Sequence, residues 1–139
     1  MIQAARTASA NAYAPYSGFG VGAAVMLADG EIVKGCNFEN ASYGLTLCAE
    51  TVALATVNTL GKLAHVREIA VIGGLLRDGV ITGIDPVRPC GRCRQIIHEA
   101  AQRGGVDIPV YCASADGAQV ERHLSSALLP YAFGPSDLI

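Results

Sequence analysis

The succession of strand-like and helix-like runs restricts the fold of this chain more than any other property. Residues 19–28 and 31–38 are strand-like runs joined by Asp29-Gly30, a pair that favours a two-residue hairpin with positive φ at both turn positions. Beyond them the patterns alternate, with helices predicted over 47–60 and 90–103 and strands over 66–72 and 108–113. Strands that alternate with helices require crossover connections and therefore some parallel pairing. We predict an α/β fold, a three-layer α/β/α sandwich with a mixed sheet of about five strands.

Glycine and proline mark the ends of the predicted helices. The alanine-rich residues 2–12 are compatible with a helix that stops before the loop over residues 13–18. The helix predicted over 47–60 contains neither proline nor glycine and meets Gly61. The second inner helix, residues 90–103, likewise ends at a pair of glycines. Each predicted helix therefore has a local stop signal.

Composition limits the class of protein. The 139 residues are enough for one domain, residues 1–139. Hydrophobic residues make up 51% of the chain, yet no run approaches the roughly 18–20 uninterrupted apolar residues of a membrane span. The net charge is −2 and the basic residues are scattered, which argues against nucleic acid and favours a small neutral partner. The first residues lack the features of a signal peptide, so we expect a cytoplasmic protein.

Three of the five cysteines lie at the starts of the two inner helices. Cys48 opens the first, whereas Cys90 and Cys93 share one face at the start of the second. Unpaired N–H groups and the helix dipole favour a thiolate at such a position. Three thiolates leave a fourth tetrahedral position open, as in catalytic zinc sites, whereas structural zinc normally has four protein ligands. We predict one catalytic Zn²⁺ per chain, bound by these three cysteines.

Glu50 follows Cys48 by two residues, and its carboxylate indicates that the predicted metal site is catalytic. A carboxylate there can approach the metal's water without binding the metal, take its proton and deliver it to a substrate. A Cys-x-x-Cys pair by itself is also compatible with a redox or buried role, and Cys48 by itself with a core thiol. Together with Glu50 and Pro89, however, the three cysteines favour a zinc enzyme.

At this point the chain resembles the short-chain, zinc-dependent cytidine deaminases, whose motifs pair such ligands with a non-ligand glutamate. The resemblance spans nearly the whole chain, and beyond the metal motifs it includes Tyr13–Ser17, Phe19, Val21–Ala24, Asn37–Tyr43 and Leu129–Phe133. The metal motif alone indicates only the deaminase superfamily. The Asn37-x-Glu39 element points to a nucleoside.

The resemblance implies hydrolytic deamination of cytidine and 2′-deoxycytidine, with ammonia released and Glu50 as the proton carrier. It assigns Asn37 and Glu39 to the ribose 3′-hydroxyl and Phe19 to the pyrimidine ring. The backbone N–H of Ala49 would meet the pyrimidine carbonyl. A buried amide and carboxylate facing a sugar reject ligands that leave them unpaired.

Two positions depart from the family pattern. Thr51 stands where relatives often place arginine or another polar partner for the thiolates, so charge compensation must come from elsewhere. We expect Arg94 to contact a ligand sulfur, with Arg92 as the second candidate. Arg88 stands before Pro89, where relatives carry a small residue, so its side chain alters the rim of the expected pocket.

The resemblance also implies a homotetramer in which neighbouring subunits complete each other's sites. Tyr43 and Phe133 match positions that close an adjacent subunit's pocket. The mean hydropathy of +0.36 fits apolar surface hidden between subunits.

Three other interpretations remain open from the sequence. A deaminase of a related aminopyrimidine nucleoside analogue or aminonucleoside antibiotic would share the segment from Pro89 to Gln95. An RNA-editing deaminase would share the zinc motif but needs a basic surface. A non-catalytic zinc module would need a fourth protein ligand and would leave Glu50 unexplained.

Overall fold

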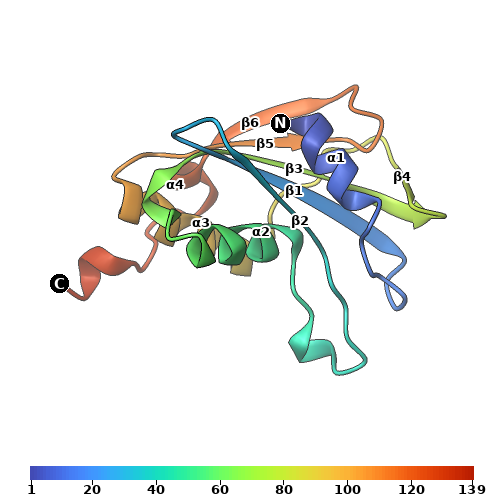
Figure 1. Cartoon of the computed structure of the whole chain (residues 1–139), viewed down its shortest axis with the longest axis horizontal. Coiled ribbons are helices and arrows are strands. Elements are labelled where there is room, and N and C mark those ends of the chain that lie inside the picture. The colour runs from blue at the N-terminus through green and yellow to red at the C-terminus, as the bar shows by residue number, and fades with distance from the viewer.

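One mixed sheet organises the structure, a computed structural model that describes all residues, 1–139 (Figure 1). Its strands are β1 (Phe19–Leu27), β2 (Ile32–Cys36), β3 (Val66–Arg77), β4 (Val80–Thr82), β5 (Pro109–Ala113) and β6 (Val120–Leu124). The helices are α1 (Ile2–Ser9), α2 (Ala49–Thr59), α3 (Gly91–Gly104) and α4 (Ser125–Leu128). The strand order is β2-β1-β3-β5-β6, with β4 paired to β3. The pair β3–β5 is parallel and the others are antiparallel, which confirms the predicted mixed α/β sheet.

Side-chain alternation along the strands divides the core between two faces of the sheet. Ala23 and Val25 of β1 belong to a cluster of 18 buried residues shared with α2 and α3, whereas Ala24 belongs to a cluster of 7 shared with α1. Helix α1 therefore covers one face, and the other helices lie across the opposite face (Figure 1). The predicted three layers are confirmed.

The helices end where local chemistry stops them. Glycine terminates both inner helices: Gly61 follows α2 with φ +73° and Gly105 caps α3 in the left-handed conformation. Helix α1 ends at Ser9, three residues before the predicted end at residue 12. None of the helices combines the length and apolar character needed to cross a membrane.

The hairpin between β1 and β2 uses one left-handed residue, so the predicted positive φ at both turn positions is wrong. Gly30 has φ +86°, and its N–H donates to the carbonyl of Leu27. The strands end farther from the turn than predicted, and the Asp29 carboxylate accepts the N–H of Glu31 at 3.0 Å. The longer connection needs only one residue in the left-handed region.

The two-residue hairpin is found later in the chain, between β3 and β4. Asp78 and Gly79 have φ values of +47° and +77°, the combination that matches the twist of a tight hairpin. Strand β3 continues through Gly73 and Gly74 to Arg77, although the sequence predicted an end at residue 72. At Gly74 an added Cβ would lie 2.2 Å from the carbonyl oxygen of Thr82, so the glycine permits β4 to pair there.

Close approach of α2 to β2 sets the position of the α2 N-terminus. A Cβ at Gly35 would lie 2.5 Å from the carbonyl oxygen of Ala49 and 2.6 Å from the nitrogen of Ala53. Both are backbone atoms of α2 and cannot rotate away. The absence of a side chain at Gly35 therefore allows this helix to lie directly on the sheet.

We expect Gly35→Ala to lower the free energy of unfolding by roughly 1–3 kcal/mol, because the new methyl group would force α2 away from the sheet. Chemical denaturation at one fixed protein concentration measures the change. Gly44→Ala is the matched control, since no atom lies within 4 Å of a Cβ built there. Equal stability of the Gly35→Ala variant and the unchanged protein would contradict the packing described.

Candidate active site

The starts of α2 and α3 bring the three predicted cysteines together. Cys48 is the N-cap residue of α2, Cys90 is the N-cap residue of α3, and Cys93 lies in the first turn of α3. Their Sγ atoms all lie within 4.8 Å of one another, and those of Cys48 and Cys90 are 3.7 Å apart. Cys93 is buried and Cys90 is exposed, so the cluster joins the core to the surface. One ion can contact all three sulfurs.

The surroundings of the sulfurs favour a negative charge on one of them. Hydrogen bonding with Cys93 and Cys90, assisted by the charge of Arg92, lowers the pKa of Cys48 to about 6 against the effect of burial. The interaction with Cys48 and burial raise the pKa of Cys93. The metal-ligand group contains no fourth His, Cys, Asp or Glu. Three thiol donors without a fourth protein ligand fit Zn²⁺ with one open position.

Glu50 lies beside the sulfur cluster. Glu50 is only 4% exposed, and its Oε2 atom lies 3.5 Å from Sγ of Cys93. Burial raises the pKa of Glu50, and the negative charge of Cys48 acts in the same direction. The carboxyl group can therefore hold and release a proton next to the predicted metal without being one of its ligands.

Thr51, rather than Arg94, supplies a polar contact to a ligand sulfur. The Thr51 hydroxyl lies 3.4 Å from Sγ of Cys93. Arg94 donates instead to the carbonyl oxygens of Pro89 and Leu128, at 2.8 and 3.0 Å, so the predicted contact with sulfur is absent here. The guanidinium therefore donates to carbonyl oxygens just before α3 and at the end of α4, rather than to a ligand sulfur. Arg92, the second candidate, donates to the carbonyl of Thr46 at 3.2 Å.

A cavity of about 170 Å³ opens beside the cysteines. Its lining includes residues of both helix starts and of the neighbouring strands, among them Asn37, Cys48, Ala49, Glu50, Arg88 and Cys90. Five predicted site residues therefore line one cavity, two of them cysteines of the thiol cluster, and Arg88 lies in the same lining. The cavity is large enough for a planar heterocycle to approach Glu50.

Asn37 and Glu39 lie near each other in sequence but line different hollows. The Asn37 side chain accepts the N–H of Val21 at 2.8 Å and donates to the carbonyl of Phe19 at 2.9 Å. Glu39, 8% exposed, accepts the N–H of Tyr16 at 2.9 Å as well as the hydroxyl and N–H of Ser17. Burial acts to raise the pKa of Glu39, but these hydrogen bonds hold it below its ordinary value. Phe19 is thus hydrogen-bonded to Asn37 through its backbone carbonyl. Glu39 instead lines a separate pocket with Tyr16, Ser17 and Tyr43.

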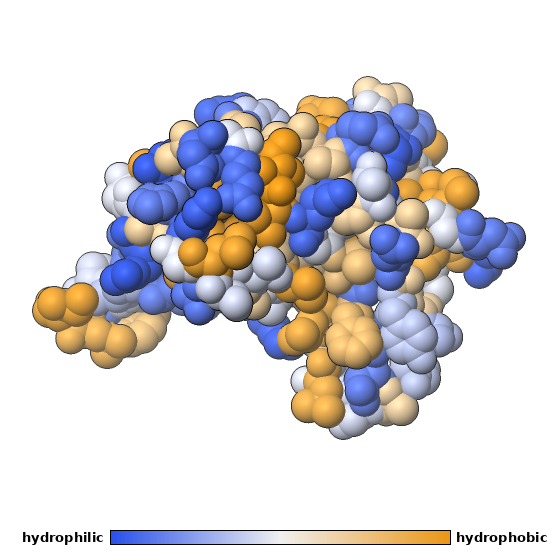
Figure 2. Space-filling view, viewed as in Figure 1, coloured by the Kyte–Doolittle hydropathy of each residue, from blue (hydrophilic) through white to orange (hydrophobic).

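Tyr43 and Phe133 are absent from the lining of the cavity in their own chain. Their exposed fractions are 73% and 61%. The carbonyl of Phe133 accepts a hydrogen bond from the side chain of Gln95, so Phe133 lies beside α3. Figure 2 shows hydrophobic surface on the projecting segment that contains Tyr43 and again at the C-terminal end.

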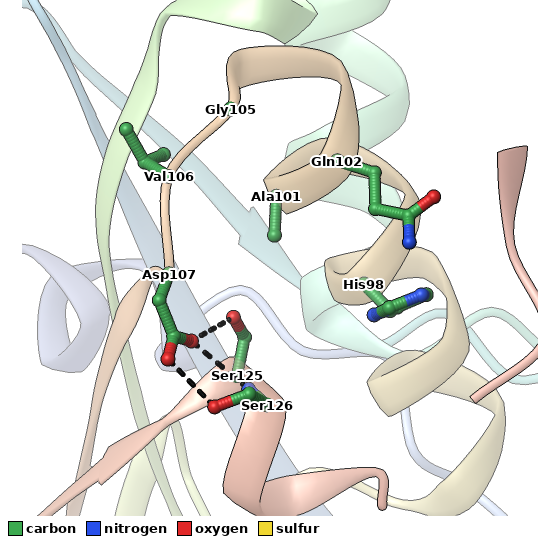
Figure 3. A pocket seen from close by; sticks show the side chains of 8 residues that line it. All are labelled: His98, Ala101, Gln102, Gly105, Val106, Asp107, Ser125 and Ser126. Atoms are coloured by element: carbon green, nitrogen blue, oxygen red, sulfur yellow. Dashed lines mark hydrogen bonds between the residues drawn. The ribbon is translucent and has the colours of Figure 1, made fainter. Parts of the chain in front are cut away.

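A second hollow, between α3 and the start of α4, is lined by neither the cysteines nor Glu50 (Figure 3). Its polar contacts are internal, because the Asp107 carboxylate accepts the hydroxyls of Ser125 and Ser126 at 2.8 and 2.6 Å. Asp107 also accepts the N–H of Ser126, at 3.0 Å. These bonds fix the start of α4, so the candidate active site is the cavity beside the cysteines.

The fold and the cavity define a zinc-dependent α/β enzyme, with three thiols and a buried carboxyl group together beside the cavity. Residues 1–106 match the family model described as the cytidine and deoxycytidylate deaminase zinc-binding region. The chain belongs to this family. Its membership accounts for the metal-ligand set and confirms the resemblance predicted from the sequence.

Relatives and solved structures agree with this assignment. The chain is 41% identical over 138 residues to a cytidine deaminase of Halalkalibacterium halodurans, covering 99% of this chain and 95% of that protein. A cytidine deaminase of Mycobacterium tuberculosis is 42% identical over 135 residues, 96% of this chain and 87% of that protein. The crystal structure of cytidine deaminase from Burkholderia pseudomallei has a TM-score of 0.81 and 39% identity over 95% of each chain.

We expect Thr51→Val to lower the affinity for Zn²⁺ about 10- to 100-fold, because the hydrogen bond that supports Cys93 would be lost. Competition with a chelator of known zinc affinity measures the change. Thr56→Val is the matched control on the same helix, since the Thr56 hydroxyl donates to the carbonyl of Val52 and not to a sulfur. Unchanged zinc affinity in the Thr51 variant would show that the hydroxyl does not support the ligand.

Proposed function

We propose that this chain catalyses the hydrolytic deamination of cytidine and 2′-deoxycytidine to uridine and 2′-deoxyuridine, with release of ammonia. The single observation that carries the proposal is the position of Glu50, buried beside Cys93 and in contact with the cavity. The similarity to cytidine deaminases over nearly the full chain supports the substrate class. It does not favour the alternative of a nucleoside analogue or aminonucleoside antibiotic.

Cys48, Cys90 and Cys93 would hold Zn²⁺, which when bound supplies the Lewis acidity that lowers the pKa of water at its open position. Glu50 would accept a proton from the attacking water as that water adds to C4 of the pyrimidine. The same carboxyl group would protonate N3 and then carry the second proton to the departing amine. The raised pKa of Glu50 favours its protonated form, which suits a group that must both accept and return a proton.

Asn37 and Ala49 are proposed to orient the nucleoside. Asn37 uses one acceptor site and one donor on β1, so its amide retains one of each for the ribose 3′-hydroxyl. Ala49 is the first residue of α2, where a backbone N–H has no partner within the helix and can meet the pyrimidine carbonyl. Glu39 is proposed to bind the ribose through the lone pairs that its hydrogen bonds with Tyr16 and Ser17 leave free. Phe19 is proposed to contact the base.

The 139 residues are proposed to act as one domain in the cytoplasm. All four helices pack on the same six-stranded sheet, which supports a single unit. All five cysteines are free thiols, and the three at the site must stay reduced to bind a metal. A reducing compartment fits this requirement.

We further propose a homotetramer in which Tyr43 and Phe133 reach a neighbouring subunit's pocket. Both aromatic side chains are largely exposed and lie outside the cavity of their own chain. Exposed apolar surface on two projecting segments is what a subunit interface would cover (Figure 2).

Light scattering is expected to give a mass four times that of the 14.4 kDa chain. If Phe133 binds substrate across an interface, Phe133→Ala should raise KM for cytidine several-fold, whereas the control Val120→Ala, also at an exposed apolar residue, should not. A monomer at assay concentration would exclude the shared site.

For the reaction itself, Glu50→Gln should keep its zinc and lose turnover by about 10²- to 10⁴-fold or more, because the amide cannot carry protons. Zinc content by elemental analysis and the rate of cytidine loss test both parts. Glu99→Gln, an exposed change on α3, should leave the rate unchanged. Near-normal turnover in the Glu50 variant would remove this residue from the mechanism.

A further inference from the structure

Arg88 is the cationic side chain in the lining of the cavity that contains Glu50. It immediately precedes Pro89 and Cys90, so it lies next to the proposed metal-ligand segment. Its side chain is 48% exposed, which places it at the mouth rather than in the core. Arg88 therefore lies where a substrate substituent would pass or rest.

The backbone around Arg88 is held on both sides. The N–H of Val87 donates to the carbonyl of Ala113 at the end of β5, at 3.2 Å. The carbonyl of Pro89 accepts the Arg94 guanidinium at 2.8 Å. A residue that precedes proline is also restricted to extended conformations. Arg88 thus starts from a fixed point beside the cavity.

Glu121 on β6 binds the other end of Arg88, and His123 on the same strand contacts Glu121. Nε and Nη2 donate to the two carboxylate oxygens of Glu121, at 2.8 and 2.5 Å. His123 lies 2.8 Å from the same Glu121 carboxylate. Glu121 is paired with Cys112, which belongs to the core beneath α2 and α3, so the pair lies on the cavity face of the sheet. The two-point contact gives a directional restraint that a single surface ion pair lacks.

Resting on the proposed function, we propose that Arg88, restrained by Glu121 and His123, is a specificity-determining residue that faces C5 of the pyrimidine. Glu50 serves N3, and Asn37 serves the sugar. With N3 at Glu50 and the sugar at Asn37, the C5–C6 edge of the ring would face the cavity wall formed by Val87, Arg88 and Cys90. Arg88 is the large side chain of that wall.

The restrained guanidinium should disfavour an apolar group on C5. A methyl group there would take the space of the side chain and would cover N–H donors without offering an acceptor. The two-point contact with Glu121 opposes rotation of Arg88 away from its position beside the cavity. Cytidine, which carries only hydrogen at C5, avoids this conflict. One methyl group typically changes discrimination by about 10- to 200-fold.

The test compares kcat/KM for 5-methylcytidine and cytidine in the zinc-loaded protein and its variants. Arg88→Ala should raise the ratio of 5-methylcytidine to cytidine about 10-fold, and Glu121→Gln should raise it less, because the side chain remains but is held less firmly. Arg122→Ala is the matched control, since Arg122 is paired with Tyr111 and its side chain lies on the opposite face of the sheet. It should leave the ratio unchanged.

A purely structural role for Arg88 would lower both rates together and leave the ratio constant. The inference is overturned if Arg88→Ala and Glu121→Gln both still convert cytidine and their ratios of kcat/KM for 5-methylcytidine to cytidine stay within twofold of that of the unchanged protein. Absence of cytidine turnover in the unchanged, zinc-loaded protein would instead refute the proposed function. The two failures are thus distinguishable.

Discussion

The site depends on the close packing of α2 against the sheet beside α3. Gly35 leaves no room for a side chain between β2 and α2, so the first turn of α2 is held where Cys48 meets Cys90. Cys93 enters the same cluster because it lies one helical turn beyond Cys90. A shift of either helix by the width of a methyl group would separate sulfurs that now lie within 4.8 Å of one another. The metal-ligand set is therefore a property of the packing of the core.

The same packing positions Glu50, the proposed proton carrier. Because α2 begins at the cluster, Glu50 lies in its buried first turn and Thr51 reaches Cys93. Burial raises the pKa of Glu50, which is unfavourable for a carboxylate with only a structural role but suits the proposed exchange of protons. Stability and catalysis here use one arrangement of two helices on one sheet.

The fold and the centre of the site could be predicted because their signals are local. Thiols at helix starts, glycines at helix ends and alternating strands identify α2, α3 and the sheet. The sequence predicts an end of the third strand at residue 72 because paired glycines are typical of loops, yet Gly73 and Gly74 lie inside β3. Neither β4, which pairs with the extended end of β3, nor β6 is among the predicted strands. The partner of Arg94 also could not be read from sequence, since it depends on the carbonyl of Leu128, 34 positions away. The contacts of Tyr43 and Phe133 remain predictions.

Ultraviolet absorbance of the zinc-loaded protein with cytidine, 2′-deoxycytidine and free cytosine, together with ammonia measurement, tests whether this site deaminates pyrimidine nucleosides. Both nucleosides should be converted, with one ammonia released for each, whereas cytosine should not, because it lacks the sugar that Asn37 and Glu39 are proposed to bind. If neither nucleoside is converted by protein with one zinc bound per chain, the proposed deaminase activity is wrong.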